Sequence, residues 1–182
     1  MERHIGRGVG EFIERELFSA KNYVLISSPD ISPDLGNKLF EMVKGGVKAR
    51  VLTSNTRGAN SDKTNRAARE LVKANMNVID SNTWNPPPLE YKIVSTEEVA
   101  MIHAKIYVID GKCAIIGSAN LTENSFWNFA EYIHITRDID EIKEIESDFD
   151  KIWNLYHDIK LEEPGTKKDM KDMIRKIRRK IS

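Results

Sequence analysis

Residues 103–120 hold the side chains of this sequence that are best suited to chemistry. Alternate residues of a strand point to the same face, so His103 and Lys105 would share one face, as would Ser118 and Asn120 on the strand that follows. An imidazole, an ammonium, a hydroxyl and a carboxamide would then meet in one patch. This set has a cation and neutral donors but no carboxylates or thiols suited to a metal, which favours phosphate over zinc as the ligand.

A hairpin must bring these two strands together. Asp110-Gly111 is a favoured hairpin turn, and it lies between two apolar runs rich in β-branched residues. Gly117 would let a ligand or a neighbouring backbone come close. Similar runs predict strands at 23–27, 47–53, 77–80, 91–94, 101–109, 114–118 and 131–136.

Helical patterns occur between and after these strands. Gly45-Gly46 ends one of them, as glycine commonly does after a helix, and Ser61-Asp62 can cap the start of another. The Pro-rich segment 81–88 can be neither helix nor central strand. The sequence therefore predicts an α/β domain with helices at 33–44, 61–74 and 139–159.

The charges are divided unevenly along the 182 residues. Residues 166–182 hold eight Lys or Arg against two Asp, a balance of 8 − 2 = +6, which leaves 20 − 26 = −6 for the rest. Apolar residues of this tail fall on one helical stripe. We expect a catalytic domain at 1–162 and a basic amphipathic helix or tail at 163–182. Such tails bind nucleic acid, anionic lipid or an acidic partner, or are simply solvated.

The cysteine content and the hydropathy indicate the cytoplasm. Cys113 is the single cysteine, so no intramolecular disulfide is possible. No apolar run approaches the roughly 20 residues that span a bilayer, and the N-terminal residues are charged where a signal peptide would be apolar.

The spacing of the motif resembles that of the phospholipase D superfamily. The signature is His-x-Lys, four residues, Asp, six residues and Gly-Ser-x-Asn. It is matched at His103, Lys105, Asp110, Gly117, Ser118 and Asn120. The family commonly adds a downstream Asn and Glu, and Glu131 is a better match than Asn128 because two residues separate them instead of one. The resemblance implies a mixed central β-sheet flanked by helices.

The resemblance also implies a role for each motif residue. His103 would attack a phosphodiester phosphorus to form a phosphohistidine. Lys105 and Asn120 would stabilise the transition-state charge, with Ser118 as a further donor, and Glu131 would orient a motif histidine. Asp110 opens the turn and, with Gly117, is assigned a structural role. We expect no metal or other cofactor.

One imidazole cannot act as nucleophile and as acid in the same step, so the family mechanism needs two motif histidines. His103 is the single histidine here that begins a His-x-Lys pair. We therefore expect an obligate homodimer, in which two phospholipase D-like halves bring two copies of His103 together across a twofold axis.

Two polar segments offer donors for a phosphate backbone. The loop after the strand at 47–53 and the basic tail both carry such side chains, although the loop is equally consistent with a polar surface. The residues expected to contact nucleic acid are Asn55, Arg57, Lys63, Arg66, Arg175, Arg178 and Arg179.

The motif specifies the reaction mechanism better than it specifies the substrate. Single-motif chains of this length most resemble the compact nucleases of the family, so we favour an endonuclease acting on DNA or RNA. A phospholipase or phosphatidyltransferase, with the tail on an anionic membrane, is the first alternative. A non-catalytic nucleic-acid-binding protein with the same fold is the second.

Overall fold

The computed structural model describes residues 2–55, 89–95 and 102–155, with the side chains of 55 and 93–95 excepted. The described strands form one seven-stranded sheet in the order β1-β7-β6-β5-β2-β3-β4. The strands are β1 (Glu2–Gly6), β2 (Tyr23–Ser27), β3 (Lys48–Asn55), β4 (Leu89–Ser95), β5 (Lys105–Ile109), β6 (Cys113–Gly117) and β7 (Glu131–Thr136).

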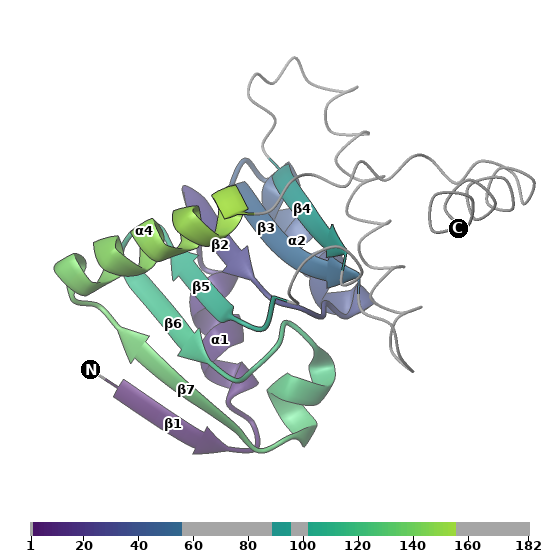
Figure 1. The fold of residues 1–182 in the computed structure, drawn as a ribbon. Coiled ribbons are helices and arrows are strands. Elements are labelled where there is room, and N and C mark those ends of the chain that lie inside the picture. Colours follow the sequence, from purple (N-terminus) through teal and green to yellow (C-terminus); the bar gives the residue numbers. More distant parts are fainter. Residues whose placement is uncertain (1, 56–88, 96–101, 156–182) are drawn as a thin grey trace, which may run out of the picture.

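The sheet is mixed, as expected from the family resemblance. β2, β3 and β4 run parallel to one another, whereas β5 is antiparallel to both β2 and β6. β7 is antiparallel to its neighbours β6 and β1. The chain therefore combines a parallel half with an antiparallel meander, and β2 and β5 join the two halves (Figure 1).

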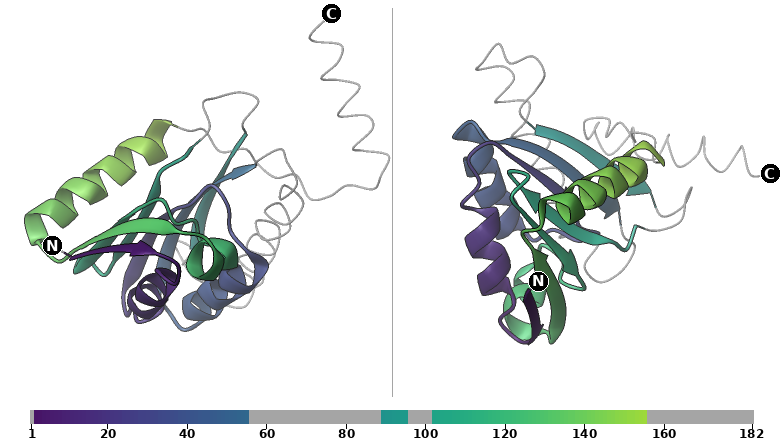
Figure 2. Two further views of the ribbon diagram at one scale, coloured as in Figure 1. Left: turned by 90° about the horizontal axis from the view of Figure 1, so that it is seen from below. Right: turned by 90° about the vertical axis from the view of Figure 1, so that its left-hand side faces the viewer.

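Helices cover both faces of the sheet. Figures 1 and 2 show α1 (Gly10–Leu17) and α2 (Pro33–Lys44) on one face and α4 (Ile139–Leu155) across the other. The larger core lies under α1 and α2 and includes Ile13 and Leu39, both fully buried. The smaller core lies under α4 and is built around Phe149 and Trp153.

Local signals explain the boundaries that were predicted to the residue. Pro33 lies in the first turn of α2, where its missing N–H costs nothing, and Gly45 and Gly46 follow its end, the latter with a φ of +102°. β2, β7, α2 and the start of α4 coincide with the predicted bounds. The strand at 77–80, the helix at 61–74 and the end of the helix at 139–159 lie outside the described residues, as does the domain boundary at 162.

Three described elements, β1, α1 and η1 (Asn124–Asn128), lie outside the predicted helix and strand ranges. β1 pairs with β7 at the edge of the sheet, and its burial alternates along ERHIG, with Ile5 83% exposed. The π-helical turn η1 precedes β7 and buries Phe126 in the larger core. Short elements of this kind give little periodicity to detect.

Candidate active site

The described motif residues other than Asp110 lie at one end of the strands, where β2 and β6 end and β5 and β7 begin (Figure 1). The antiparallel pairing produces this arrangement. Lys105, the first residue of β5, is the cross-strand partner of Gly117, the last residue of β6. Gly117 is in turn the partner of Ile133, two residues after Glu131 begins β7. The hairpin and the strand beside it therefore bring the motif together.

The strand predicted at 101–109 begins later than expected. β5 starts at Lys105, so His103 lies in the connection before it, with its side chain exposed. His103 and Lys105 are therefore not brought together by the predicted alternation along one strand. Instead, Lys105 Nζ donates a hydrogen bond to the His103 carbonyl at 2.8 Å, and Ser27 Oγ donates to the Ala104 carbonyl at 3.0 Å. These two bonds fix the segment that carries the imidazole.

Lys105 is 5% exposed, although it carries a charge. Burial lowers the pKa of its ammonium from the ordinary 10.5, and the negative charges of Asp30 and Glu131 offset part of that effect. A poorly solvated cation attracts an anion more strongly than a cation in water does. Lys105 is therefore suited to holding a phosphate at the exposed His103.

Gly117, Ser118 and Glu131 join β6 to the start of β7. A Cβ on Gly117 would come 2.1 Å from the Tyr132 carbonyl oxygen, so the glycine is needed for the close approach of a backbone. Ser118 Oγ donates to the Glu131 carboxylate and accepts the Tyr132 N–H at 3.0 Å. Within the described chain, Glu131 thus holds Ser118 rather than a histidine, and the hydroxyl hydrogen of Ser118 is already committed.

Asn120 follows β6 in a loop that is fixed on both sides. The Leu121 N–H donates to Ser28 Oγ at 2.8 Å, and the Leu121 carbonyl accepts the Ser32 N–H at 2.9 Å. The carboxamide itself donates from Nδ2 to Asp30 Oδ2 at 3.4 Å. Ser28, Asp30 and Ser32 all follow β2, so a segment far away in sequence positions Asn120.

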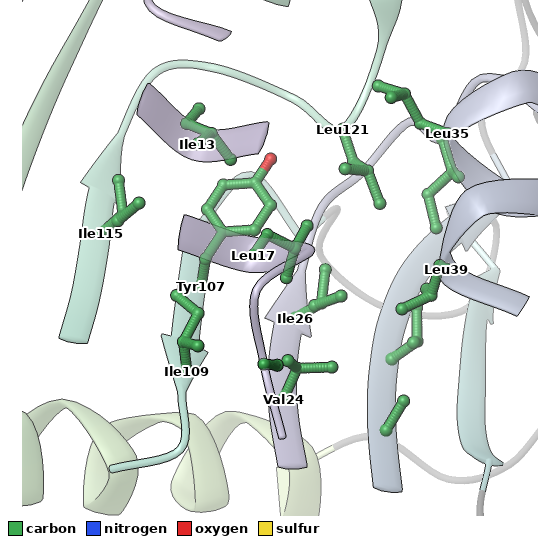
Figure 3. Packing of buried hydrophobic residues seen from close by; sticks show 14 of the residues in the cluster. Ile13, Leu17, Val24, Ile26, Leu35, Leu39, Tyr107, Ile109, Ile115 and Leu121 are labelled. Atoms are coloured by element: carbon green, nitrogen blue, oxygen red, sulfur yellow. The ribbon is translucent and has the colours of Figure 1, made fainter. Parts of the chain in front are cut away.

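Tyr107 fixes the other side of the same loop. Figure 3 shows its ring among the side chains of the larger core, with the hydroxyl directed towards the loop that carries Leu121. The hydroxyl donates to the Ala119 carbonyl at 2.9 Å. Burial raises the pKa of Tyr107 well above its ordinary value, so the hydroxyl keeps its hydrogen throughout the working pH range.

Asp110 lies at the opposite end of β5 from Lys105 and opens the turn, with a φ of +53°. Its carboxylate accepts the backbone N–H groups of Lys21, Asn22 and Tyr23 at 2.8, 2.7 and 2.9 Å. Burial raises the pKa of this carboxyl, but the three N–H donors outweigh it and hold the pKa below the ordinary 3.8. Asp110 therefore connects the hairpin to the start of β2.

Sequence reasoning did not find Ser28, Asp30 or Tyr107 as parts of this site. Tyr107 shares the strand of Lys105 two residues on, and Ser28-Pro29-Asp30 follows a buried strand, which is the place where such folds bind ligands. The place of Ser28-Pro29-Asp30 directly after a buried strand was the feature of the sequence that could have indicated a role in the site. The side chain of Asn55, at the end of β3, lies outside the described residues, as do Arg57, Lys63, Arg66, Arg175, Arg178 and Arg179.

The described residues contain neither a cluster of metal ligands nor a membrane-spanning helix. No group of three or more His, Cys, Asp or Glu side chains in this part of the chain is placed to hold a metal ion. No described helix is both long and apolar enough to cross a membrane.

A family model described as the PLD-like domain of cardiolipin synthase matches residues 13–153. This is more than half of the chain, and it contains every motif residue at the end of the strands where β5 and β7 begin. No curated protein matches the sequence.

Solved structures share the fold at low sequence identity. The chain is similar to Nuc from Salmonella typhimurium, a phospholipase D family member, with a TM-score of 0.66 and 16% identity over 84% of this chain and 94% of that one. It is similar to NucT from Helicobacter pylori, with a TM-score of 0.59 and 18% identity over the same shares. It is also similar to TrmBL2, an archaeal chromatin protein described as showing a novel mode of DNA binding, with a TM-score of 0.56 and 14% identity over 87% of this chain and 54% of that one.

Proposed function

The chain belongs to the phospholipase D-like family, and on that premise we propose that it is a metal-independent phosphodiesterase, an endonuclease that hydrolyses DNA or RNA. The observation that carries this proposal is the geometry at the end of the strands where β5 and β7 begin. An exposed imidazole, that of His103, is carried on a segment held by the buried ammonium of Lys105, beside Asn120 and Glu131. Nucleophile, cation and neutral donor are the groups needed for displacement at phosphorus.

The proposed reaction has two displacements. In the first, a lone pair on the His103 imidazole forms a P–N bond, the P–O bond to the leaving group breaks, and an imidazolium protonates the leaving oxygen. In the second, the imidazole thus made neutral takes a proton from water, the water oxygen bonds to phosphorus, and the P–N bond breaks. Imidazole is the side chain that can serve both as a nucleophile and as an acid near neutral pH.

The second imidazole is proposed to be His103 of another subunit. Two of the other histidines are described, and their surroundings support this. His4 stacks on the ring of Phe12 with centroids 3.5 Å apart and bonds Glu2, while His134 Nε2 lies 3.4 Å from a Glu141 carboxylate oxygen. Neither belongs to a His-x-Lys pair. A twofold homodimer would supply the acid with no further motif.

Lys105 and Asn120 are proposed to bind the non-bridging phosphate oxygens. Both are held in place before substrate arrives, which lowers the reorganisation needed in the transition state. Ser118 and Glu131 are proposed to act as a pair, with Glu131 accepting from Ser118 in the free protein and from a motif histidine of the dimer during turnover. No cofactor is invoked.

The nuclease assignment is supported by size and by one structural neighbour. The match covers 94% of both Nuc and NucT, so the shared fold accounts for nearly the whole of those chains. TrmBL2, of which the shared fold covers 54%, is described as showing a novel mode of DNA binding. The charge of the 166–182 tail, +6, suits a phosphate backbone.

A lipid substrate is the second candidate, because the matching family model is described as that of cardiolipin synthase. A phospholipase or phosphatidyltransferase would use the same displacement at phosphorus and would place the basic amphipathic tail on an anionic membrane. The third reading, a binding protein without turnover, predicts that no phosphodiester is cleaved.

A substrate panel separates these functions. The full chain is incubated with labelled single-stranded DNA, duplex DNA, RNA and vesicles of phosphatidylglycerol, each at several salt concentrations. We expect cleavage of a nucleic acid, with binding that weakens steeply as salt rises and a shallower salt dependence after removal of 166–182. Turnover of the vesicles alone would establish the lipid function, and binding without turnover of any substrate would leave the third reading.

A further inference from the structure

We propose that Asp30 is a positioning residue of this active site, which orients the carboxamide of Asn120 and balances the charge of Lys105. The inference rests on the proposed phosphodiesterase function. Asp30 lies outside the motif and some 90 residues before Asn120 in the chain. Nothing in its sequence surroundings, beyond its place after a buried strand, marks it as functional.

The backbone around Asp30 is held by buried hydroxyl groups. Ser28, which is fully buried, accepts the Leu121 N–H and donates to the Asp30 carbonyl at 2.6 Å. The carbonyl of Pro29 accepts Thr53 Oγ1 at 3.1 Å and the Ser54 N–H at 3.2 Å. Asp30 is therefore fixed to β3 on one side and to the Asn120 loop on the other.

The carboxylate determines which end of the Asn120 carboxamide faces it. An ionised Asp accepts hydrogen bonds and cannot donate them, so the NH₂ group and not the oxygen must face Asp30. The NH₂ group has two hydrogens, and Asp30 uses one of them, which leaves the other for a phosphate oxygen. The opposite end, Asn120 Oδ1, is buried and has no hydrogen-bond partner among the described residues. The orientation of the Asn120 carboxamide therefore follows from the Asp30 carboxylate, which accepts from Nδ2, because no described group donates to Oδ1.

The same carboxylate acts on Lys105 through its charge. The charged groups that act on this ammonium are Asp30 from the segment after β2 and Glu131 from β7. Burial lowers the pKa of Lys105, and Asp30 opposes that effect more than Glu131 does. Asp30 therefore favours the protonated lysine that a phosphate site requires.

The test compares Asp30→Asn with Asp148→Asn. The control removes the same charge from an exposed position of α4, on the other face of the sheet. Lys105 is titrated through its ¹³Cε resonance, the Asn120 side-chain amide is followed by NMR, and kcat is measured against pH. The NMR measurements need no substrate, so they test Asp30 even if the panel above shows no phosphodiester cleavage.

With Asp30→Asn we expect the Lys105 titration and the alkaline limb of kcat to move to lower pH, and kcat to fall about 10- to 100-fold. The Asn120 amide resonances should shift, because the carboxamide introduced at position 30 can donate to Oδ1 of Asn120 and turn that side chain. Asp148→Asn should have the wild-type Lys105 titration, the wild-type Asn120 resonances and the wild-type kcat. A Lys105 titration and Asn120 resonances unchanged by Asp30→Asn would overturn the inference.

Should Asp30→Asn not fold, Asp30→Glu provides the test. It keeps the charge but displaces the carboxylate by one methylene, so the Lys105 titration should stay close to the wild type while kcat falls. An Asp30→Glu variant with wild-type kcat and wild-type Asn120 resonances would show that Asn120 does not depend on Asp30 for its orientation.

Discussion

The Nζ atom of Lys105 donates a hydrogen bond to the backbone carbonyl of His103, 2.8 Å away. The lysine of the motif is thus bonded to the main chain of the motif histidine, while the imidazole itself is exposed. One buried side chain fixes the segment that carries the proposed nucleophile and also brings positive charge to it. The bond joins residues two positions apart, of which only the second, Lys105, belongs to β5.

Lys105→Met should separate stability from activity. We expect no turnover, because the cation is lost, but an unfolding temperature at pH 7 equal to or higher than that of the wild type, because the cost of burying this charge exceeds the offset from Asp30 and Glu131. Differential scanning fluorimetry of both proteins measures this. A large fall in unfolding temperature with Lys105→Met would show that the ammonium stabilises the fold.

The difference in stability between the wild type and Lys105→Met should depend on pH. Burial lowers the folded-state pKa of Lys105 below the unfolded value of 10.5, so between the two values the unfolded chain binds more protons. The stability of the wild type should therefore rise, relative to Lys105→Met, as pH increases through the lowered pKa towards 10.5. A stability difference that does not change with pH in this range would contradict the assigned shift.

Asp110→Asn should destabilise the fold, most strongly at neutral pH. The folded-state pKa of Asp110 is depressed, so its contribution is present above the unfolded value of 3.8 and is lost as pH falls through the folded value. Asparagine tolerates the positive φ of this turn, so the change tests the three N–H contacts rather than backbone strain. We expect a loss of about 1–2 kcal/mol at pH 7.

Urea unfolding of wild type and Asp110→Asn at a series of pH values between 2 and 7 provides the measurement. The two unfolding midpoints should converge as the medium becomes acidic. Midpoints that differ by the same amount at every pH would mean that the carboxylate charge is not what stabilises this turn.

Tyr107→Phe should impair catalysis although residue 107 faces the larger core. The change removes the donor to the Ala119 carbonyl and so loosens one side of the Asn120 loop. We expect about 1–2 kcal/mol of lost stability and a kcat reduced about tenfold or more, since small displacements of a catalytic group are costly. Unfolding curves and steady-state kinetics measure the two effects, and an unchanged kcat would remove Tyr107 from the positioning of Asn120.

How far the sequence predicts this structure depends on how local the signals are. α2 and the 110–111 turn were predicted because Pro33, Gly45 and Gly111 act within a few residues. β1 was not predicted, because its five residues, ERHIG, include three titratable side chains and lie at a sheet edge.

The site could be predicted as far as the motif reaches. The motif gave His103, Lys105 and Asn120 at fixed spacing, and the hairpin and the neighbouring strand bring their segments to one end of the strands. The contact of Asp30 with Asn120 could not be predicted, because it depends on the antiparallel pairing of β2 with β5, although the place of Asp30 after a buried strand was a weak signal. Nor was the Ser118–Glu131 hydrogen bond predicted, since the resemblance assigned Glu131 to a histidine and Ser118 to the phosphate.

Subunit mixing tests the shared active site. If two copies of His103 form one site, a dimer with a single His103→Ala subunit lacks either the nucleophile or the acid. Unfolding and refolding an equal mixture of wild type and His103→Ala should therefore leave about one quarter of the wild-type activity, whereas independent subunits would leave about one half. Sedimentation of the same mixture verifies that dimers have formed.

The most direct test of the proposed chemistry is nucleic-acid cleavage in excess EDTA, with His103→Ala beside the wild type. After rapid quenching, an acid-labile, base-stable phosphohistidine that still carries one part of the cleaved strand is sought. We predict cleavage that survives the chelator, a trapped phosphohistidine in the wild type, and neither cleavage nor phosphoprotein in His103→Ala. Cleavage that stops in EDTA, or that persists without His103, would contradict the mechanism.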